Sequence, residues 1–378
     1  MYSIMVDNWL KYMLLTLIAA SLLSTSALAD CECGYSVNAT SDPEHIVYTD
    51  IIETNFRTVQ NLSYNDAWEI QTSEFPYDPT SGQYGRIDEL RNVISNPLIE
   101  NSTWSGSGTL GPDAGVQIWT RAGIPTNNLV PMGEIRTSRS DILYGSIRAL
   151  IKATSTNGTC GAFFWYYNDT QEIDNEILSR QNNPGNNTGA VNLILQSLAS
   201  EAAGYNAAET PTFDTYPLPF NPADGFHEYR FDWTPEKISF YADGKWLRDM
   251  TQNIPDNAGR GYFNHWSNGN PSWSGGPPNV DAKMTVAYFL AYFNSSNPAR
   301  LSDYKSRCPS VAGTHSICTI PEYNSTQPFF FTEQKNMTNN QTNASGDATS
   351  NDSGSVMVGP LPQCMMLLIF LAGLFAVL

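Results

Sequence analysis

Short apolar segments dominate the middle of the chain, from residue 45 to residue 300. Clusters of Gly, Pro, Asn and Asp separate them, a pattern typical of short strands joined by turns. Asp243-Gly244 is a hairpin signal directly after one such segment, so 245–250 is predicted as its returning strand. Helical periodicity is scarce, and we predict one short helix at 88–95. Strands are predicted at 116–121, 144–153, 161–167, 171–178, 191–196, 227–233, 237–242 and 284–293. This many short strands over roughly 250 residues favours an all-β fold, a single β-sandwich or jelly-roll domain.

The N-terminal end carries a different pattern. Residues 14–23 form an apolar run preceded by Lys11, and Ala27-Leu28-Ala29 matches a small-x-small cleavage site. The run is too short to span a bilayer, so a signal peptide over 1–29 is favoured over a membrane anchor. The mature chain is then expected to begin at Asp30.

The C-terminal end is apolar as well. Residues 364–378 follow a short spacer and a cluster of small residues at 351–355, and no Lys or Arg comes after the tail. This arrangement predicts a GPI-anchor signal, with 356–378 removed. A tail-anchored helix is the alternative, but it would normally carry flanking basic residues. We therefore expect a secreted protein held at the cell surface, on the plasma membrane or in the cell wall, by a lipid anchor.

The segment before this tail is rich in Asn, Ser and Thr, and we predict a solvated, glycosylated stalk over 321–355. The predicted domain then covers 30–320. Asn-x-Ser/Thr sequons support a secretory route. They occur at Asn38, Asn61, Asn101, Asn157, Asn168, Asn186, Asn294, Asn324, Asn336, Asn340, Asn343 and Asn351.

The net charge of the chain argues against one class of partner. The chain has 20 Lys and Arg against 37 Asp and Glu, a formal net charge of −17. Phosphate binding needs a positive field, so no nucleic-acid partner is expected. Aromatic residues make up 12% of the chain, enough for a substantial core. We expect a monomer.

Cysteine use fits an oxidising compartment. Cys364 lies in the tail that would be removed, which leaves five cysteines. Cys31 and Cys33 are too close to pair easily with each other, so we expect them to pair with Cys308 and Cys318. Cys160 would then be free and buried at the start of an apolar strand. The spacing does not match common zinc sites, and we expect no metal and no cofactor.

One predicted strand carries the candidate chemistry. In 171–178, residues i, i+2 and i+4 point to the same face, so Glu172, Asp174 and Glu176 form a row of carboxylates. The opposite face, with Ile173, Asn175 and Ile177, is mostly core-like. Three like charges in line repel each other, so stability gives no reason for such a row.

The spacing of the row suits catalysis. The Cα atoms of Glu172 and Glu176 should lie about 13 Å apart, a gap that two leaning side chains can close to the ~5–5.5 Å of a retaining glycosidase. Crowding also separates the pKa values, so one carboxyl can stay protonated while another is ionised. A solvated charged face or a Ca²⁺ site remains the alternative, although calcium usually recruits irregular loop carbonyls.

Several blocks together resemble glycoside hydrolase family sixteen. Residues 172–176 match its E-x-D-x-E signature, and 132–136 with 143–145 are similar to its segment lining the donor side of the cleft. The block 226–244 is similar to its FHxYxFxWxP…FYVDG sequence. Residues 264–269 with Trp273 are similar to its N-x-W loop. The resemblance covers residues 110–295.

The resemblance implies a concanavalin A-like β-jelly roll with a glycan cleft on its concave sheet. It also implies a retaining endo-acting β-glucan hydrolase or transglycosylase of the cell wall, of the fungal GPI-anchored type. By position, the catalytic residues would be Glu172 as nucleophile, Asp174 as its helper and Glu176 as acid/base. The predicted contacts to the polysaccharide substrate are Glu134, Arg136, Trp165, Asn264, Trp266 and Trp273.

Other sequence features bear on these assignments. Asn175 and the aromatic stretch 163–169 depart from the family pattern and leave the preferred glucan open. We expect Trp233 in the core and His227 in a structural role, and Arg136 could simply neutralise Glu134. A non-catalytic lectin on the same fold is the second hypothesis, although the intact carboxylate row disfavours it. A structural wall protein is a third.

Overall fold

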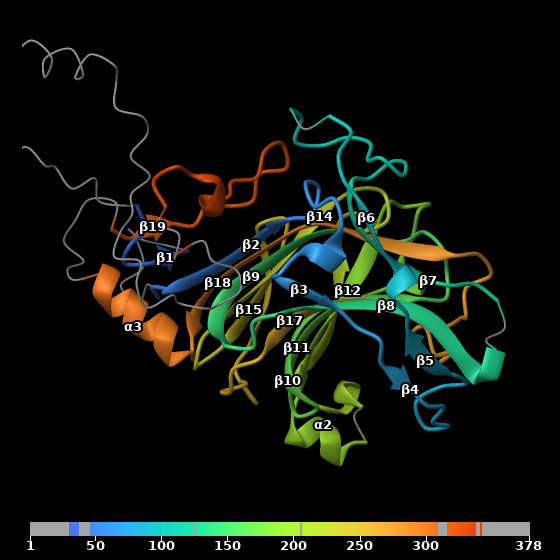
Figure 1. Cartoon of the computed structure of the whole chain (residues 1–378). Helices are drawn as coiled ribbons and strands as arrows, with labels where there is room; N and C mark the ends of the chain where they lie inside the picture. The colour runs from blue at the N-terminus through green and yellow to red at the C-terminus, as the bar shows by residue number, and fades with distance from the viewer. Residues whose placement is uncertain are drawn as a thin grey trace, which may run out of the picture.

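Two large β-sheets form the body of the molecule in a computed structural model that describes residues 30–37, 46–100, 102–123, 126–204, 206–308, 316–337 and 341. The predicted signal peptide and GPI signal lie outside these residues. The sheets are open and pack face to face, and a two-stranded sheet lies at one end of the sandwich (Figure 1). The prediction of an all-β sandwich is confirmed.

The nine-stranded sheet has the order β13-β12-β11-β10-β17-β8-β5-β4, and β3 also pairs with β8. Its strands are β3 (Trp68–Ile70), β4 (Glu74–Phe75), β5 (Gly85–Asp88), β8 (Leu129–Thr137), β10 (Cys160–Asn168), β11 (Gln171–Leu178), β12 (Gly189–Gln196), β13 (Phe213–Leu218) and β17 (Arg260–Trp266). The pairs are antiparallel except for β5 with β8.

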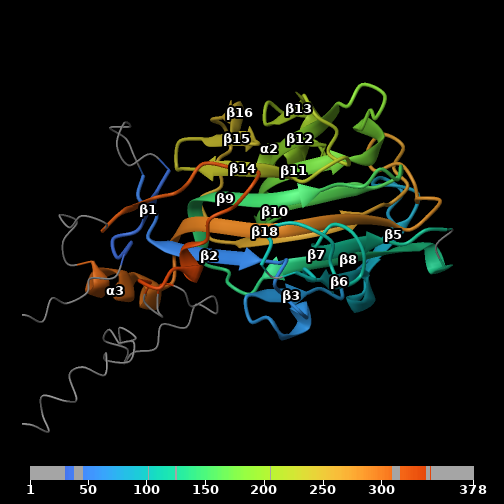
Figure 2. The same ribbon diagram turned by 90° about the horizontal axis from the view of Figure 1, so that it is seen from above.

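The eight-stranded sheet has the order β16-β15-β14-β9-β18-β7-β6, and β2 also pairs with β18. Figure 2 shows β14, β9, β18 and β2 side by side in one layer. The strands are β2 (Asp50–Asn55), β6 (Val93–Asn96), β7 (Gly115–Thr120), β9 (Ile142–Lys152), β14 (His227–Trp233), β15 (Ile238–Ala242), β16 (Lys245–Met250) and β18 (Ala282–Ser295).

The helices are short. They are α2 (Leu198–Ala202), α3 (Pro298–Arg307) and the 3₁₀ turns η1 (Leu62–Tyr64), η2 (Leu90–Asn92), η3 (Thr126–Asn128), η4 (Ser179–Gln181), η5 (Ala207–Glu209) and η6 (Phe331–Glu333). The sequence did not predict α3, which begins after an Asn297 cap with Pro298 in its first turn. No helix in the described ranges is long and apolar enough to cross a membrane.

The strand predictions are confirmed, with shifts of a few residues at their ends. Asp243 and Gly244 both have positive φ, the conformation that a two-residue hairpin turn requires, and β16 returns as predicted. The helix predicted at 88–95 is wrong. That segment makes the single 3₁₀ turn η2 and then joins β7 as strand β6, so sheet pairing overrides the local helical pattern.

The core between the sheets is built from alternate strand residues, and aromatic rings fill its centre. Phe163 and Phe263 stack with ring centroids 5.2 Å apart, and Trp165 and Trp233 lie 4.4 Å apart. Trp233 is fully buried, as expected. His227 lies on β14 of the eight-stranded sheet, where it contacts Asp243 at 2.7 Å, in keeping with the structural role expected for it.

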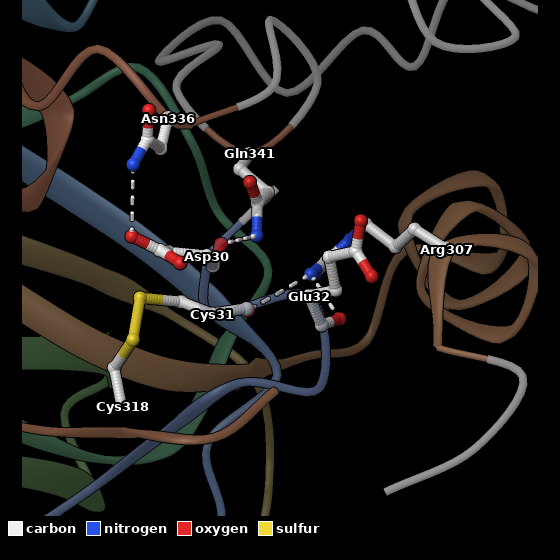
Figure 3. Close-up of a disulfide and its surroundings, with 7 residues drawn as sticks. All are labelled: Asp30, Cys31, Glu32, Arg307, Cys318, Asn336 and Gln341. Atoms are coloured by element: carbon white, nitrogen blue, oxygen red, sulfur yellow. Dashed lines mark hydrogen bonds between the residues drawn. A yellow bond between two sulfur atoms is a disulfide. The ribbon is translucent and has the colours of Figure 1, made fainter. Parts of the chain in front are cut away.

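The two ends of the described chain meet at one end of the sandwich, where β1 (Tyr35–Ser36) pairs with β19 (Cys318–Thr319). Disulfides join Cys31 to Cys318, as Figure 3 shows, and Cys33 to Cys308. The predicted pairing of the N-terminal with the C-terminal cysteines is therefore confirmed. Cys160 is free and buried, also as predicted.

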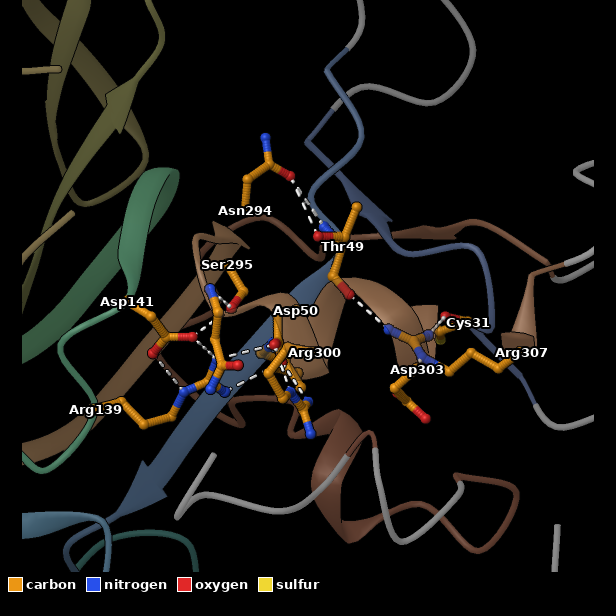
Figure 4. Close-up of polar contacts among 12 residues, drawn as sticks. Cys31, Thr49, Asp50, Arg139, Asp141, Asn294, Ser295, Arg300, Asp303 and Arg307 are labelled. Carbon is orange, nitrogen blue, oxygen red and sulfur yellow. Dashed lines mark hydrogen bonds and ion pairs between the residues drawn. The ribbon is translucent and has the colours of Figure 1, made fainter. Parts of the chain in front are cut away.

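A buried ion cluster reinforces the same end. Asp50 accepts hydrogen bonds from the guanidinium groups of both Arg139 and Arg300, and Arg139 also pairs with Asp141 (Figure 4). Asp50, Arg139 and Arg300 are each about 97% buried or more. Because an isolated charge at this depth would be costly, each partner depends on the others.

The predicted boundary between domain and stalk at residue 320 is wrong. Ile320, Phe330 and Phe331 are buried in a second apolar cluster. The Phe331 ring lies 5.1 Å from that of Tyr35, and Thr332 donates to Glu53. The apolar residues at 329–331 attach this polar segment to the domain, so the packed chain extends at least to residue 337.

Candidate active site

The carboxylate row lies on strand β11, on the face of the nine-stranded sheet that points away from the core. Ile173, Asn175 and Ile177 are buried on the inner face. Glu172 and Glu176 are partly exposed on the outer face, and Asp174 is 5% exposed. The carboxylates at 172, 174 and 176 and the isoleucines at 173 and 177 fix this orientation, because turning the strand over would bury three charges between the sheets.

Pairing across the sheet brings the other predicted residues to the same face. Glu176 lies opposite Ala162 on β10, Ala162 lies opposite Asn264 on β17, and Asn264 lies opposite Glu134 on β8. A second set of directly paired residues crosses the same four strands, in the order Asp174, Phe164, Tyr262 and Arg136. Strands from distant parts of the sequence therefore build one continuous outer surface around the row.

Two of the three carboxyl groups share a hydrogen bond. Burial and the neighbouring charges of Glu172 and Glu176 raise the pKa of Asp174 well above its usual range. Burial raises the pKa of Glu172 to about 7, the hydrogen bond from Asp174 lowers it, and the charge of Glu176 raises it. Asp174 therefore keeps its proton and donates to Glu172, and Glu172 is the first member of this pair to ionise as the pH rises.

Glu176 is the third carboxyl and has different partners. The indole Nε1 of Trp273 donates to its Oε2 at 2.7 Å. Burial raises the pKa of Glu176 to about 7, whereas hydrogen bonds from the Cys160 thiol and from Trp273, together with the charge of Arg86, lower it. A carboxyl with such a pKa can release a proton and take it back near neutral pH, as a general acid/base must.

Apolar side chains surround Glu176 on its strand and beside it. Met132, Cys160, Leu178 and Trp266 form a small cluster on the outer face, and Trp273 packs against it. These groups keep water away from the carboxyl, which explains why burial dominates its pKa. Trp266 is the last residue of β17 and 9% exposed, so it is not in a loop.

Glu134 and Arg136 follow each other on the outer face of β8. Asn264 donates to Glu134 at 3.1 Å. Arg136 forms its ion pair with Glu69 at 2.7 Å while its charge also lowers the pKa of Glu134, so it does more than neutralise Glu134. Glu69 on β3 lies directly across from Arg136, which explains the choice of partner.

The inclusion of Trp165 among the sugar contacts is wrong. Its side chain is fully buried between the sheets, and its Nε1 donates to the carbonyl oxygen of Ile142. Phe164 and Tyr166, its neighbours on β10, belong to the outer face. Tyr144 also lies away from the row, because it belongs to β9 in the eight-stranded sheet and its ring packs 5.1 Å from that of Trp233.

The sequence missed several residues at this surface. The guanidinium of Arg86 on β5 lies 4.7 Å above the Trp266 ring and 4.8 Å from the Phe75 ring. Burial raises the pKa of Asp88, on the same strand, to about 7. Residues 84–88 show no alternation that would mark a strand, so nothing in the sequence signals their position between β8 and β4.

The sequence of this chain is similar to those of several known proteins. Residues 102–289 match the family model for glycosyl hydrolases family 16. The chain is 26% identical over 211 residues to a beta-glucanase of Bacillus subtilis, a match that covers 54% of this chain and 80% of that protein. It is 24% identical over 265 residues to Crh-like protein 3 of Botryotinia fuckeliana, covering 60% and 55%.

Two further matches extend the comparison. A xylanase/beta-glucanase of Ruminococcus flavefaciens is 31% identical over 171 residues, which are 44% of this chain but 18% of that protein. This chain thus spans less than two thirds of the length of that enzyme and of the Crh-like protein. A solved beta-glucanase structure from Bacillus licheniformis superposes with a TM-score of 0.48 at 18% identity, covering 64% of this chain and 97% of that one.

Proposed function

This chain belongs, through residues 102–289, to glycosyl hydrolase family 16, and on that premise we propose that it cleaves β-glucan of a cell wall with retention, as an endo-acting hydrolase or transglycosylase. The observation that carries the proposal is the row of Glu172, Asp174 and Glu176 on one exposed sheet face, with separate hydrogen-bond partners for its two ends. A row of this kind offers a nucleophile and an acid at once.

In the first step, the ionised Glu172 attacks the anomeric carbon of the bound sugar. The hydrogen bond from Asp174 holds the attacking carboxylate in place and keeps it charged. Glu176 gives its proton to the leaving glycosidic oxygen, so the leaving chain departs as a neutral alcohol. A covalent glycosyl-enzyme on Glu172 remains.

In the second step, Glu176 acts as a base. It takes a proton from water or from a hydroxyl group of a second glycan, and that oxygen attacks the anomeric carbon and releases Glu172. Attack by water gives hydrolysis, whereas attack by a glycan gives transfer. The net stereochemistry is retention in both cases, because the carbon is inverted twice.

The substrate is proposed to cross the outer face over β8, β17 and β11. Glu134, Arg136 and Asn264 offer polar groups to sugar hydroxyls, and the rings of Trp266 and Trp273 offer faces on which pyranose C–H groups can stack. The apolar surroundings of Glu176 fit an acid that must remain protonated until the substrate arrives.

The test replaces the nucleophile and tries to restore it. Glu172→Gly should lose at least about 10³-fold in kcat on β-glucan oligosaccharides, and added azide should restore turnover with an α-glycosyl azide as product. Glu100→Gly, at an exposed carboxyl far from the row in sequence, is the control. An enzyme that is inactive in its native form on all β-glucans, or a Glu172→Gly variant that retains activity, would overturn the proposal.

We also propose that the protein is secreted and held at the cell surface through a lipid anchor. The two disulfides support passage through an oxidising compartment. Treatment of intact cells with a phosphatidylinositol-specific phospholipase should release the protein in soluble, active form. Retention on treated cells, with release of a known anchored protein as positive control, would contradict the anchor.

A further inference from the structure

The turn between β10 and β11 presents an asparagine in a distinctive setting. Asn168-Asp169-Thr170 is a sequon at the tip of the hairpin that carries the carboxylate row. The Oδ1 atom of Asn168 accepts hydrogen bonds from both the backbone N–H and the hydroxyl of Thr170, each at 3.1 Å. Asn168 is exposed, and its Nδ2 has no hydrogen-bond partner among the described residues.

Two neighbouring tyrosines support this turn. The hydroxyl of Tyr166 donates to Asp169 at 2.7 Å and thereby holds the turn in shape. Tyr167 is 47% exposed at the hairpin tip, although a large ring gains nothing there from packing. The exposed Tyr167 ring, one residue from Asn168 in sequence, offers an apolar face at the same turn.

The position of Asn168 links it to the active site. Tyr166 lies directly opposite Glu172, a bulge then interrupts β10, and Asn168 lies opposite Gln171, the residue next to Glu172 on β11. Asn168 therefore lies near the Glu172 end of the carboxylate row, and a bulky group attached to it extends from that end of the row.

We propose that Asn168 carries an N-linked glycan that stands at the edge of the active site and restricts polymeric substrates more than short ones. The inference rests on the proposed function and on passage through the secretory route. The Nδ2 atom bonds to the anomeric carbon of an oligosaccharide supplied on a lipid pyrophosphate, Nδ2 loses one proton, and the lipid pyrophosphate leaves.

The chain contains a matched control for this site. Tyr323-Asn324-Ser325-Thr326 repeats the same local arrangement, because Asn324 Oδ1 accepts from the backbone N–H of Thr326 at 2.9 Å and from its hydroxyl at 2.7 Å. Asn324 is likewise exposed. Its neighbour Tyr323 contacts the turn between β15 and β16 in the other sheet, so this sequon lies away from the row.

The experiment compares the two sequons in full-length protein secreted from a host that attaches N-glycans. Peptide mapping by mass spectrometry measures occupancy at each asparagine. Thr170→Ala and Thr326→Ala each remove one sequon, and Thr170→Ser keeps both the sequon and the hydroxyl. For each protein, kcat/KM is measured on high-mass β-glucan and on short β-glucan oligosaccharides.

We expect Asn168 to be occupied. Thr170→Ala should raise the ratio of polymer to oligosaccharide kcat/KM at least about threefold, whereas Thr326→Ala and Thr170→Ser should leave it unchanged within about twofold. Trimming the native protein with an endoglycosidase should reproduce the Thr170→Ala result without any substitution.

An unmodified Asn168 in an active enzyme would overturn the glycan proposal alone. An occupied Asn168 whose removal leaves the ratio unchanged would overturn its effect on substrate access. Because occupancy is measured without reference to activity, an occupied Asn168 in a protein inactive on all glucans would overturn the proposed function, and with it any role of the glycan in access.

Discussion

Replacing Glu172, the proposed nucleophile, should make the protein more stable at alkaline pH while abolishing its activity. Burial raises the pKa of Glu172 to about 7 from an ordinary value of 4.5. Between pH 4.5 and pH 7, Glu172 is ionised in the unfolded chain but protonated in the folded protein. Stability therefore falls as pH rises through this window, and the full cost is present above pH 7 and absent below pH 4.5.

The size of the effect follows from the same values. A pKa difference of about 2.5 corresponds to about 3 kcal/mol at most, and because Glu172 is partly exposed we expect about 1–3 kcal/mol. Glu172→Gln removes the charge but keeps the shape and an acceptor for Asp174. At pH 8 the variant should exceed the native protein by this amount, whereas at pH 4 the two should be nearly equal.

Thermal unfolding at pH 4, 6 and 8 provides the assay. In a domain of this size, each kcal/mol moves Tm by about 2 °C. The exposed Glu100→Gln is the control, and its Tm should follow that of the native protein at each pH. A Glu172→Gln variant that is equally or less stable than the native protein at pH 8, or whose advantage is the same at pH 4, would refute the reasoning.

Three further predictions address other parts of the structure. Trp273→Phe removes the hydrogen-bond donor to Glu176 and should raise the pKa of that carboxyl. The basic limb of the plot of kcat/KM against pH should therefore move to higher pH, and a limb that does not move would contradict this prediction. Asp50→Asn removes the buried carboxylate that pairs with the guanidinium groups of Arg139 and Arg300. It should lower the free energy of unfolding in urea by about 3–5 kcal/mol, and a loss below about 1 kcal/mol would contradict this. Trp165→Leu should cost about 2–4 kcal/mol in the same assay while the KM for oligosaccharides stays unchanged, since the indole lies in the core; a large rise in KM would place it at the substrate.

Alternation of polar and apolar residues decided which predictions succeeded. The segment 171–178 has a carboxylate at every second position from 172 to 176, so both the strand and the outer face of the carboxylate row could be predicted. The segment 161–167 is apolar throughout, and such a run identifies a strand without saying which face each residue occupies. This is why Trp165 was assigned to the wrong side of the sheet.

The remaining misses share a physical cause. Strands β2, β3 and β5 depend on partners far along the chain, because β2 pairs with β18 and both β3 and β5 pair with β8. Local sequence carries little signal for such pairings. Contacts such as Trp273 with Glu176, or Arg86 above Trp266, form between segments about 100 to 180 residues apart and cannot be deduced from spacing.

The central position of β18 has a consequence for how the protein is made. This strand, Ala282–Ser295, pairs with β2, β7 and β9 in the middle of the eight-stranded sheet, yet it is the last long strand to be synthesised. Until β18 is synthesised, β2, β7 and β9 lack this partner and have unpaired edges, and such edges favour aggregation. Folding should therefore be completed only after synthesis of the domain is nearly finished, and it should be slow because its decisive contacts join the two ends of the domain.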